Sequence, residues 1–171
     1  VAVDSTNTPQ GSDVGAHNGQ AVNITDKSAN PSTGTGNTVT VTTASGAVTP
    51  QVNVTDVTFT GPADSADHSA AITITGDGEA SVALNGVSVT GDNPAIGVLG
   101  GGTVNLDLTG LDADIDGQGV AMSVNNATVN INVNGENTVD AEGIGMSVSN
   151  ADVTVTGDAA SDALSVTSAS P

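Results

Sequence analysis

The chain of 171 residues has no cysteine, tryptophan or tyrosine and only one phenylalanine. Without cysteine it forms no disulfide and no cysteine-ligated zinc site. Lys27 is its only lysine or arginine and stands against 19 acidic residues, so the formal net charge is −18. Because contacts to phosphate need Lys or Arg, this balance argues against binding to nucleic acid or to anionic membrane surfaces. No apolar run reaches the roughly 18 residues of a membrane-spanning helix.

The scarcity of aromatic residues means that any core is built from small side chains. Valine is abundant and alternates with polar residues in segments such as 21–25, 38–42 and 51–60. This period of two, interrupted by Gly, Asn, Asp and Pro, is typical of β-strands, and no stretch keeps a helical period. We therefore expect an all-β protein with a thin core.

A repeat in the second half is the strongest signal in the sequence. Similar strands begin at Ala71, Ala95, Ala121 and Gly145, with spacings of 24, 26 and 24 residues. A second strand follows each of them, and a third follows in three of the four units. A repeat of this length with three strands predicts a single-domain parallel β-solenoid, or β-helix, with about 24 residues per coil. Right-handed winding is the expectation. A β-sandwich is the alternative fold, but it does not predict such regular spacing.

Stacking the units predicts five interior columns of apolar side chains, each covered by the neighbouring coils. They are Ile72, Ile96, Met122 and Met146; Ile74, Val98, Val124 and Val148; Val82, Val104, Val129 and Val153; Leu84, Leu106, Ile131 and Val155; and Val89, Ile115 and Val139.

The first half follows the same plan less regularly. QVNVTDVTFTG from Gln51 resembles SVALNGVSVTG thirty residues later, which predicts a coil with an inserted loop. Residues 1–20 contain few apolar side chains and are predicted to form an extended N-terminal arm, able to donate a strand, ahead of a solenoid over 21–171. Because the sequence begins at Val1 rather than Met, we expect a processed mature protein.

Residues 80–148 carry a family resemblance. The strings SVALNGVSVTGDNPAIGVLGGGTVNLDLTG and GVAMSVNNATVNINVNGENTV are similar to bacterial extracellular β-helix surface proteins of the carbohydrate-binding-domain-containing and adhesin type. The resemblance implies a parallel β-helix that is secreted or held at the cell surface. It also implies calcium binding and a polysaccharide or another cell surface as partner.

An acidic segment suggests where calcium would bind. Asp112, Asp114 and Asp116 alternate along LDADIDG, so as a strand they place three carboxylates on one outer face. The predicted register puts Asp116 beside Asp140 and Gln118 beside Glu142. Neighbouring carboxylates repel unless a cation neutralises them, and calcium takes six to eight oxygen ligands. The candidate ligands are Asp92, Asp112, Asp114, Asp116, Asp140 and Glu142; the alternative is a solvated acidic face.

No motif points to catalysis. His17 and His68 stand in polar segments without matched partners, and no nucleophile motif is present. We therefore expect a protein that is not an enzyme. Asn23, Asn53 and Asn126 begin N-x-T sequons, which would accept glycans in a glycosylating organism.

The two ends of the sequence suggest assembly. Val1 and Val3 alternate with polar residues at the start, Leu164 and Val166 do so near the end, and no capping segment is evident. Open strand edges template pairing with another chain. The expectation is a non-enzymatic extracellular structural protein, the subunit of a homopolymeric head-to-tail filament. The alternative is a calcium-dependent carbohydrate-binding or adhesive surface module.

Overall fold

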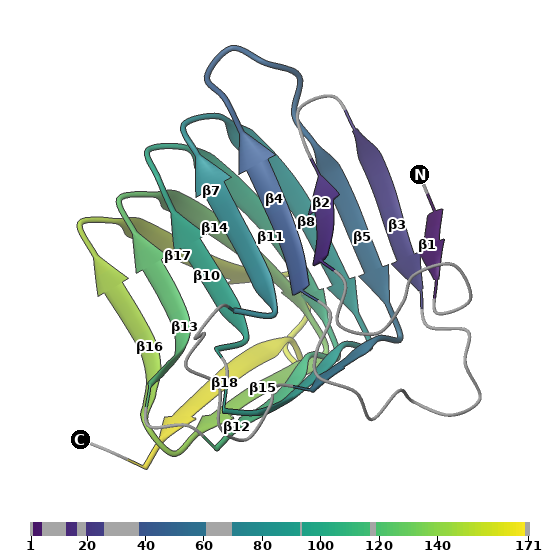
Figure 1. The fold of residues 1–171 in the computed structure, drawn as a ribbon. Helices are drawn as coiled ribbons and strands as arrows, with labels where there is room; N and C mark the ends of the chain where they lie inside the picture. Colours follow the sequence, from purple (N-terminus) through teal and green to yellow (C-terminus); the bar gives the residue numbers. More distant parts are fainter. Residues whose placement is uncertain are drawn as a thin grey trace.

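The strands wind into three parallel sheets that enclose a core in the computed structural model (Figure 1). The structure describes residues 2–4, 13–16, 20–25, 38–60, 70–92, 94–116 and 119–169. Within these ranges every regular element is a β-strand, and no helix suited to crossing a membrane occurs. The predicted all-β parallel solenoid is confirmed.

Sheet A is the largest of the three. Its spatial order is β1 (Ala2–Asp4), β3 (Ala21–Thr25), β5 (Gln51–Thr55), β8 (Glu79–Asn85), β11 (Thr103–Thr109), β14 (Thr128–Asn134) and β17 (Asp152–Gly157).

Sheets B and C form the other two sides. Sheet B consists of β2 (Asp13–Ala16), β4 (Thr38–Thr43), β7 (Ile72–Gly76), β10 (Ile96–Leu99), β13 (Val120–Asn125) and β16 (Ile144–Ser149). Sheet C consists of β6 (Thr58–Thr60), β9 (Ser88–Gly91), β12 (Asp112–Ile115), β15 (Glu136–Ala141) and β18 (Ala163–Ser168). From β4 onward, each turn of the chain adds one strand to sheet B, then to sheet A, then to sheet C.

The interior is formed by alternate residues of each strand. In β14, for example, Val129, Ile131 and Val133 are buried, whereas the residues between them are exposed. Both predicted columns of sheet B are confirmed, since Ile72, Ile96, Met122 and Met146 occupy equivalent positions in successive strands. The same pairings align Ile74, Val98, Val124 and Val148.

For three residues of the predicted columns, the observed strand register is shifted by two residues from the predicted one. Val82 lies beside Leu106 rather than Val104, and Leu84 lies beside Leu108. In sheet C, Ile115 lies beside Ala141, and Ala113 takes its place between Val89 and Val139. A shift of two residues keeps every side chain on the same face, so alternation alone cannot distinguish these registers. The small interior residues Ala80 and Ala113 are the ones that the sequence pattern overlooked.

The predicted match between the segment from Gln51 and the segment thirty residues later is confirmed, because β5 pairs with β8 and β6 pairs with β9. Gln51 pairs with Ser81 in sheet A, and Thr58 pairs with Ser88 in sheet C. The predicted inserted loop falls largely on residues 61–69, outside the described ranges.

The corners between sheets use residues with positive φ. Between sheets A and C, Asp56, Gly86, Gly110 and Gly135 all take this conformation. Between sheets B and A the backbones of successive turns approach so closely that a Cβ on Gly102 would lie 2.0 Å from the carbonyl oxygen of Gly78. Only glycine fits there without a backbone shift.

One buried polar side chain holds three turns together. Asn137 is 1% exposed and occupies the interior column position of Leu111, one turn earlier. Its Oδ1 accepts the Leu111 N–H at 2.9 Å, and its Nδ2 lies 3.2 Å from the Gly135 carbonyl and 3.3 Å from that of Ala163. The amide therefore gives partners to the Leu111 N–H and the Ala163 carbonyl, and it adds a second donor to the Gly135 carbonyl, which also accepts the Ala163 N–H at 3.0 Å.

Candidate functional site

The last turn of the solenoid exposes side chains that are buried in the turn before it. In sheet B, Val124 is 3% exposed, whereas Val148, its neighbour in β16, is 47% exposed. In sheet A, Ile131 is 1% exposed and its neighbour Val155 is 49% exposed. These side chains occupy core positions that no described segment covers.

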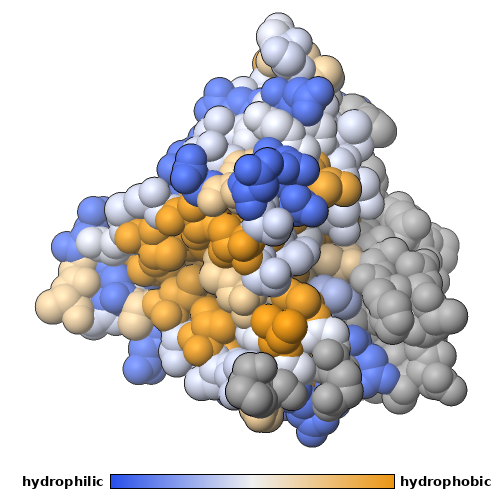
Figure 2. Space-filling model, turned by 90° about the vertical axis from the view of Figure 1, so that its left-hand side faces the viewer, coloured by the Kyte–Doolittle hydropathy of each residue, from blue (hydrophilic) through white to orange (hydrophobic). Residues whose placement is uncertain are grey.

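The exposed residues form one patch at the end of the molecule. Figure 2 looks onto this end and shows apolar side chains gathered at its centre with polar side chains around them. We call this surface the open end; its residues are Ile144, Met146, Val148, Val153, Val155, Leu164 and Val166. Met146, Val153 and Leu164 are half-buried against the core, and the other four are exposed.

The open end also presents backbone. β16, β17 and β18 are the terminal strands of sheets B, A and C, and each contains six residues. The outer side of each strand has no neighbouring strand among the described residues. Such an edge offers a row of N–H and C=O groups to another strand.

Of the predicted assembly residues, two lie on the open end. Leu164 and Val166 belong to β18, beside Asn137 and Val139 of β15. Val3 belongs to β1 and pairs with Ile24, and Val1 lies outside the described residues.

Five further open-end residues were not predicted as assembly residues. They are Ile144, Met146, Val148, Val153 and Val155, of which all but Ile144 were placed on the correct interior faces. Their exposure arises because no described turn is stacked over them, and the repeat pattern does not specify where the stack ends.

At the opposite end the sheets stop at different turns. β1 pairs with β3, and β2 pairs with β4, so both described pieces of the predicted N-terminal arm are strands at sheet edges. β6 is the first strand of sheet C. In Figure 1, β1 lies beyond β3 at the edge farthest from the C-terminus.

The acidic residues follow the outer face of sheet C in a register that differs from the predicted one. Asp114, not Asp116, lies beside Asp140. The Asp116 N–H donates to the Gly91 carbonyl and the Glu142 N–H to the Ile115 carbonyl, so Asp92, Asp116 and Glu142 take equivalent positions in successive turns. The prediction that Asp116 faces Asp140 is wrong, because it carried the same two-residue slip as the Ile115 column. Gln118 lies outside the described residues.

Hydroxyl groups accompany these carboxylates. Thr138 donates from Oγ1 to Asp112 Oδ1 at 3.1 Å, and Thr167 donates from Oγ1 to Asp140 Oδ1. A shallow hollow of about 350 Å³ lies beside them, lined by Asp114, Asp140, Glu142, Thr167 and their neighbours. Within the described ranges, no three carboxylate or imidazole side chains come close enough to form a metal-binding group.

One carboxylate has a clear structural role next to the open end. Asp162 accepts the Gly135 N–H at 2.9 Å through Oδ1 and the Ala159 N–H at 2.7 Å through Oδ2. These backbone hydrogen bonds, that from Gly135 first, lower the pKa of Asp162 below its ordinary value of 3.8. Asp162 thus ties the connection between β17 and β18 to the preceding turn.

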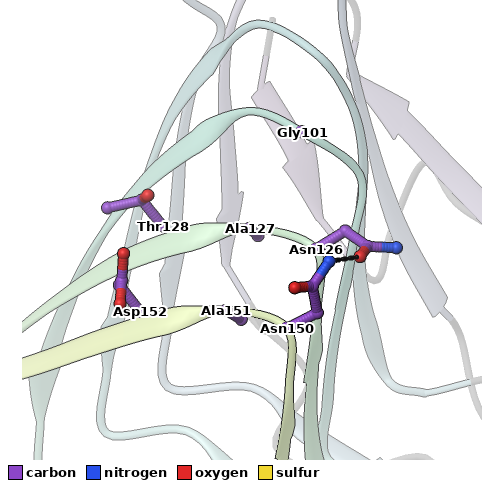
Figure 3. Close-up of a pocket in the computed structure, with 7 residues that line it drawn as sticks. All are labelled: Gly101, Asn126, Ala127, Thr128, Asn150, Ala151 and Asp152. Carbon is purple, nitrogen blue, oxygen red and sulfur yellow. Dashed lines mark hydrogen bonds between the residues drawn. The ribbon is translucent and has the colours of Figure 1, made fainter.

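The three sequons lie in two places. Asn23 and Asn53 are neighbours on sheet A, and Asn53 Nδ2 donates to Asn23 Oδ1 at 2.9 Å. Asn126 lies at the corner between β13 and β14, where Asn150 Nδ2 donates to its Oδ1 at 2.6 Å. Figure 3 shows this pair beside a polar hollow of about 300 Å³, with Thr128 and Asp152 across it.

The described residues include no lysine, arginine or histidine, because Lys27, His17 and His68 fall outside them. The described surface therefore has no basic side chain to pair with its carboxylates. Comparison with protein-family models, with curated proteins and with solved structures gives no match to this chain.

Proposed function

We propose that this chain is a non-enzymatic extracellular structural protein whose copies join head to tail into a surface filament. The observation that carries the proposal is the open end. It combines half-exposed core side chains with three strand edges that no described strand covers, and strands of a second copy can pair with such edges.

The free energy of apolar burial, compared with the cost of association, indicates that strand pairing must contribute to the junction. Burying the exposed halves of Ile144, Val148, Val155 and Val166 is worth about 1 kcal/mol each. Association costs roughly 4–15 kcal/mol in lost freedom of motion. Apolar burial alone therefore does not hold two copies together. Backbone hydrogen bonds, each worth about 0.5–1.5 kcal/mol net, supply the remainder.

The area of the junction depends on how many edges it covers. Each edge strand of six residues is roughly 20 Å long, and its backbone with side chains is about 10 Å thick. A junction that covers all three edges buries roughly 1,200 Å² in total, at the lower limit for stable interfaces, and a single edge buries roughly 400 Å². A head-to-tail contact that does not close into a ring propagates as a filament.

Charge opposes the junction. Each copy carries a formal −18, and mutual repulsion is screened over about 8 Å at physiological salt. Assembly should therefore strengthen as salt or divalent cation is added.

The test compares the parent chain with Val155→Asp by sedimentation velocity and negative-stain microscopy. Val155→Asp places a charge on the open end, where the unassembled chain can hydrate it, so the variant should fold but remain monomeric. Thr154→Asp adds the same charge at the neighbouring outward position of β17 and should still form filaments. A parent chain that stays monomeric at high concentration overturns the proposal, and equal loss in both variants would show that net charge, not the open end, governs assembly.

The alternative proposal is a calcium-dependent carbohydrate-binding or adhesive module. It is favoured by the pairing of Asp114 with Asp140 beside a hollow that Glu142 also lines. A cation there would relieve the repulsion between the carboxylates, and remaining ligand positions could take sugar hydroxyls. Calcium titration by calorimetry tests it, with Asp114→Asn/Asp140→Asn as the variant. Calcium-dependent retention of monomeric protein on insoluble polysaccharide, lost in the double variant, would favour this function over the filament.

A further inference from the structure

The two ends of the solenoid are not matched in all three sheets. β16, β17 and β18 follow one another in the chain and form one complete turn at the open end. At the other end, β1 pairs with β3, while β2, which precedes β3 in the chain, pairs with β4. Sheet A therefore extends one turn farther than sheet B, as the edge position of β1 in Figure 1 also shows.

This step restricts how a second copy can dock. If β16 of one copy paired with β2 of the next, β1 of the next copy would have to occupy the layer already filled by β17. If β17 instead pairs with β1, no described strands overlap. One strand position of sheet B, between β16 and β2, and two positions of sheet C, between β18 and β6, are then left without a described strand. Only the second arrangement avoids a clash between described strands.

We propose, on the basis of the proposed filament function, that copies join through sheet A, with β17 of one copy pairing in parallel with β1 of the next. The occupant of the open end is thus the N-terminal edge of a second copy. Continuing the register of sheet A fixes the alignment. Asn132 lies beside Thr156 at one end, and Asn23 lies beside Ala2 at the other. Successive pairings in sheet A place one residue of each strand in a single column, which runs through Asn23, Asn53, Ala83, Asp107 and Asn132. If this column continues across the junction, Thr156 lies beside Ala2 of the next copy.

The register has an electrostatic consequence. Asp4, at the end of β1, comes next to the chain just beyond β17, where Asp158 follows Gly157. Two acidic residues from different copies then take paired positions in the register, and no basic residue occurs in the described part of the chain. Like charges at paired positions are unfavourable, so this contact makes the junction sensitive to salt.

The absence of natural cysteine permits a direct test by disulfide formation in assembled protein. Ala2→Cys/Thr156→Cys should give a ladder of covalent oligomers on oxidation, since neighbouring strands hold Cα atoms about 5 Å apart and disulfides need roughly 4.4–6.8 Å. Ala2→Cys/Thr154→Cys is the register control, because Thr154 lies two residues away on the same face of β17. Gly15→Cys/Ser147→Cys joins the sheet B edges, which the proposal keeps one strand position apart. Neither control should form a ladder.

A second readout compares two open-end positions of nearly equal exposure. Val155, at 49%, belongs to sheet A, and Val148, at 47%, belongs to sheet B. Val155→Asp should raise the concentration needed for assembly at least tenfold more than Val148→Asp does. Filaments that form a ladder with the Gly15–Ser147 pair, or that tolerate Val155→Asp better than Val148→Asp, overturn the sheet A junction and leave the filament function standing. A parent chain without filaments would instead remove the function itself.

Discussion

Replacing Asn137 tests how the solenoid closes its corner between sheets A and C. The Asn137→Leu substitution keeps the size of the side chain and matches the Leu111 beside it, but it removes the acceptor for the Leu111 N–H. It also removes the donor that serves the Gly135 and Ala163 carbonyls. At 1% exposure, water cannot replace these partners without a structural opening.

The expected cost arises from these contacts. A buried donor or acceptor left without a partner costs about 1–3 kcal/mol. Two groups, the Leu111 N–H and the Ala163 carbonyl, lose their partner at a cost of about 2–6 kcal/mol. Leucine returns about 1–2 kcal/mol through apolar burial, so the net loss centres on about 2–3 kcal/mol. This is a large share of the roughly 5–15 kcal/mol that stabilises a typical domain.

Asn137→Asp gives a second, independent signature. The carboxylate still accepts the Leu111 N–H but faces the Gly135 and Ala163 carbonyls with a negative oxygen. Burial without a counter-charge raises the pKa of such a carboxyl, so the folded state binds its proton more tightly than the unfolded state does. This variant should therefore be least stable at neutral pH and regain stability as pH falls.

Urea denaturation followed by circular dichroism measures both variants, since the chain has no tryptophan or tyrosine for fluorescence. Asn125→Leu and Asn125→Asp are the matched controls, because Asn125 is exposed at the end of β13 and is paired with the uncharged Leu99 and Ser149. They should change the free energy of unfolding by less than about 0.5 kcal/mol. If Asn137→Leu is as stable as the parent, the corner does not depend on the amide and the reasoning fails.

Three further predictions concern stability. Ile131→Asp places a charge in the dry core at a position 1% exposed and should cost several kcal/mol in urea denaturation; a parent-like midpoint would contradict the interior columns. Gly102→Ala would bring a Cβ within 2.0 Å of the Gly78 carbonyl oxygen, so the melting temperature of this variant should fall. Gly110→Ala is its control: Gly110 has open space around it but a φ of +63°, so this variant reports backbone strain alone. Asp162→Asn should weaken the chain at neutral pH. The pKa of Asp162 is lowered in the folded state, so its contribution is complete above 3.8 and disappears as pH falls through the folded value; a difference between parent and variant that persists in strong acid would contradict this.

Salt dependence tests the junction register. Asp4→Asn/Asp158→Asn removes the negative charges at the two proposed paired positions and should allow filaments to form at lower salt than the parent needs. Asp107→Asn/Asp112→Asn changes the net charge equally at exposed positions within the solenoid. Equal shifts in both double variants would indicate that total charge, not the junction pair, sets the salt requirement.

The sequence predicts the architecture because the repeat and the alternation are both strong. The spacing between Ala71 and Gly145 predicts the turns, and the two sheet B columns are a direct result of it. Registers in sheets A and C are harder to predict, since a two-residue shift preserves the buried face. Ala80 and Ala113 are interior, yet a small residue carries little hydrophobic signal.

Features that arise only when turns meet were harder still to predict. Asn137 reads as a polar strand residue, and its burial becomes evident only from the backbone groups of three turns. The exposure of Val148 and Val155 is similarly a property of the end of the stack, because the same residue types are buried one turn earlier. The acidic face was predicted as a surface, but its pairing of Asp114 with Asp140 depended on the register.

Electron microscopy of the parent chain across a concentration series, at physiological salt, tests the central claim most directly. Unbranched filaments that lengthen with concentration are expected, and aligned filaments should diffract at about 4.8 Å along their axis because the strands run across it. A population that remains single solenoids at every concentration, with and without calcium, would contradict head-to-tail assembly.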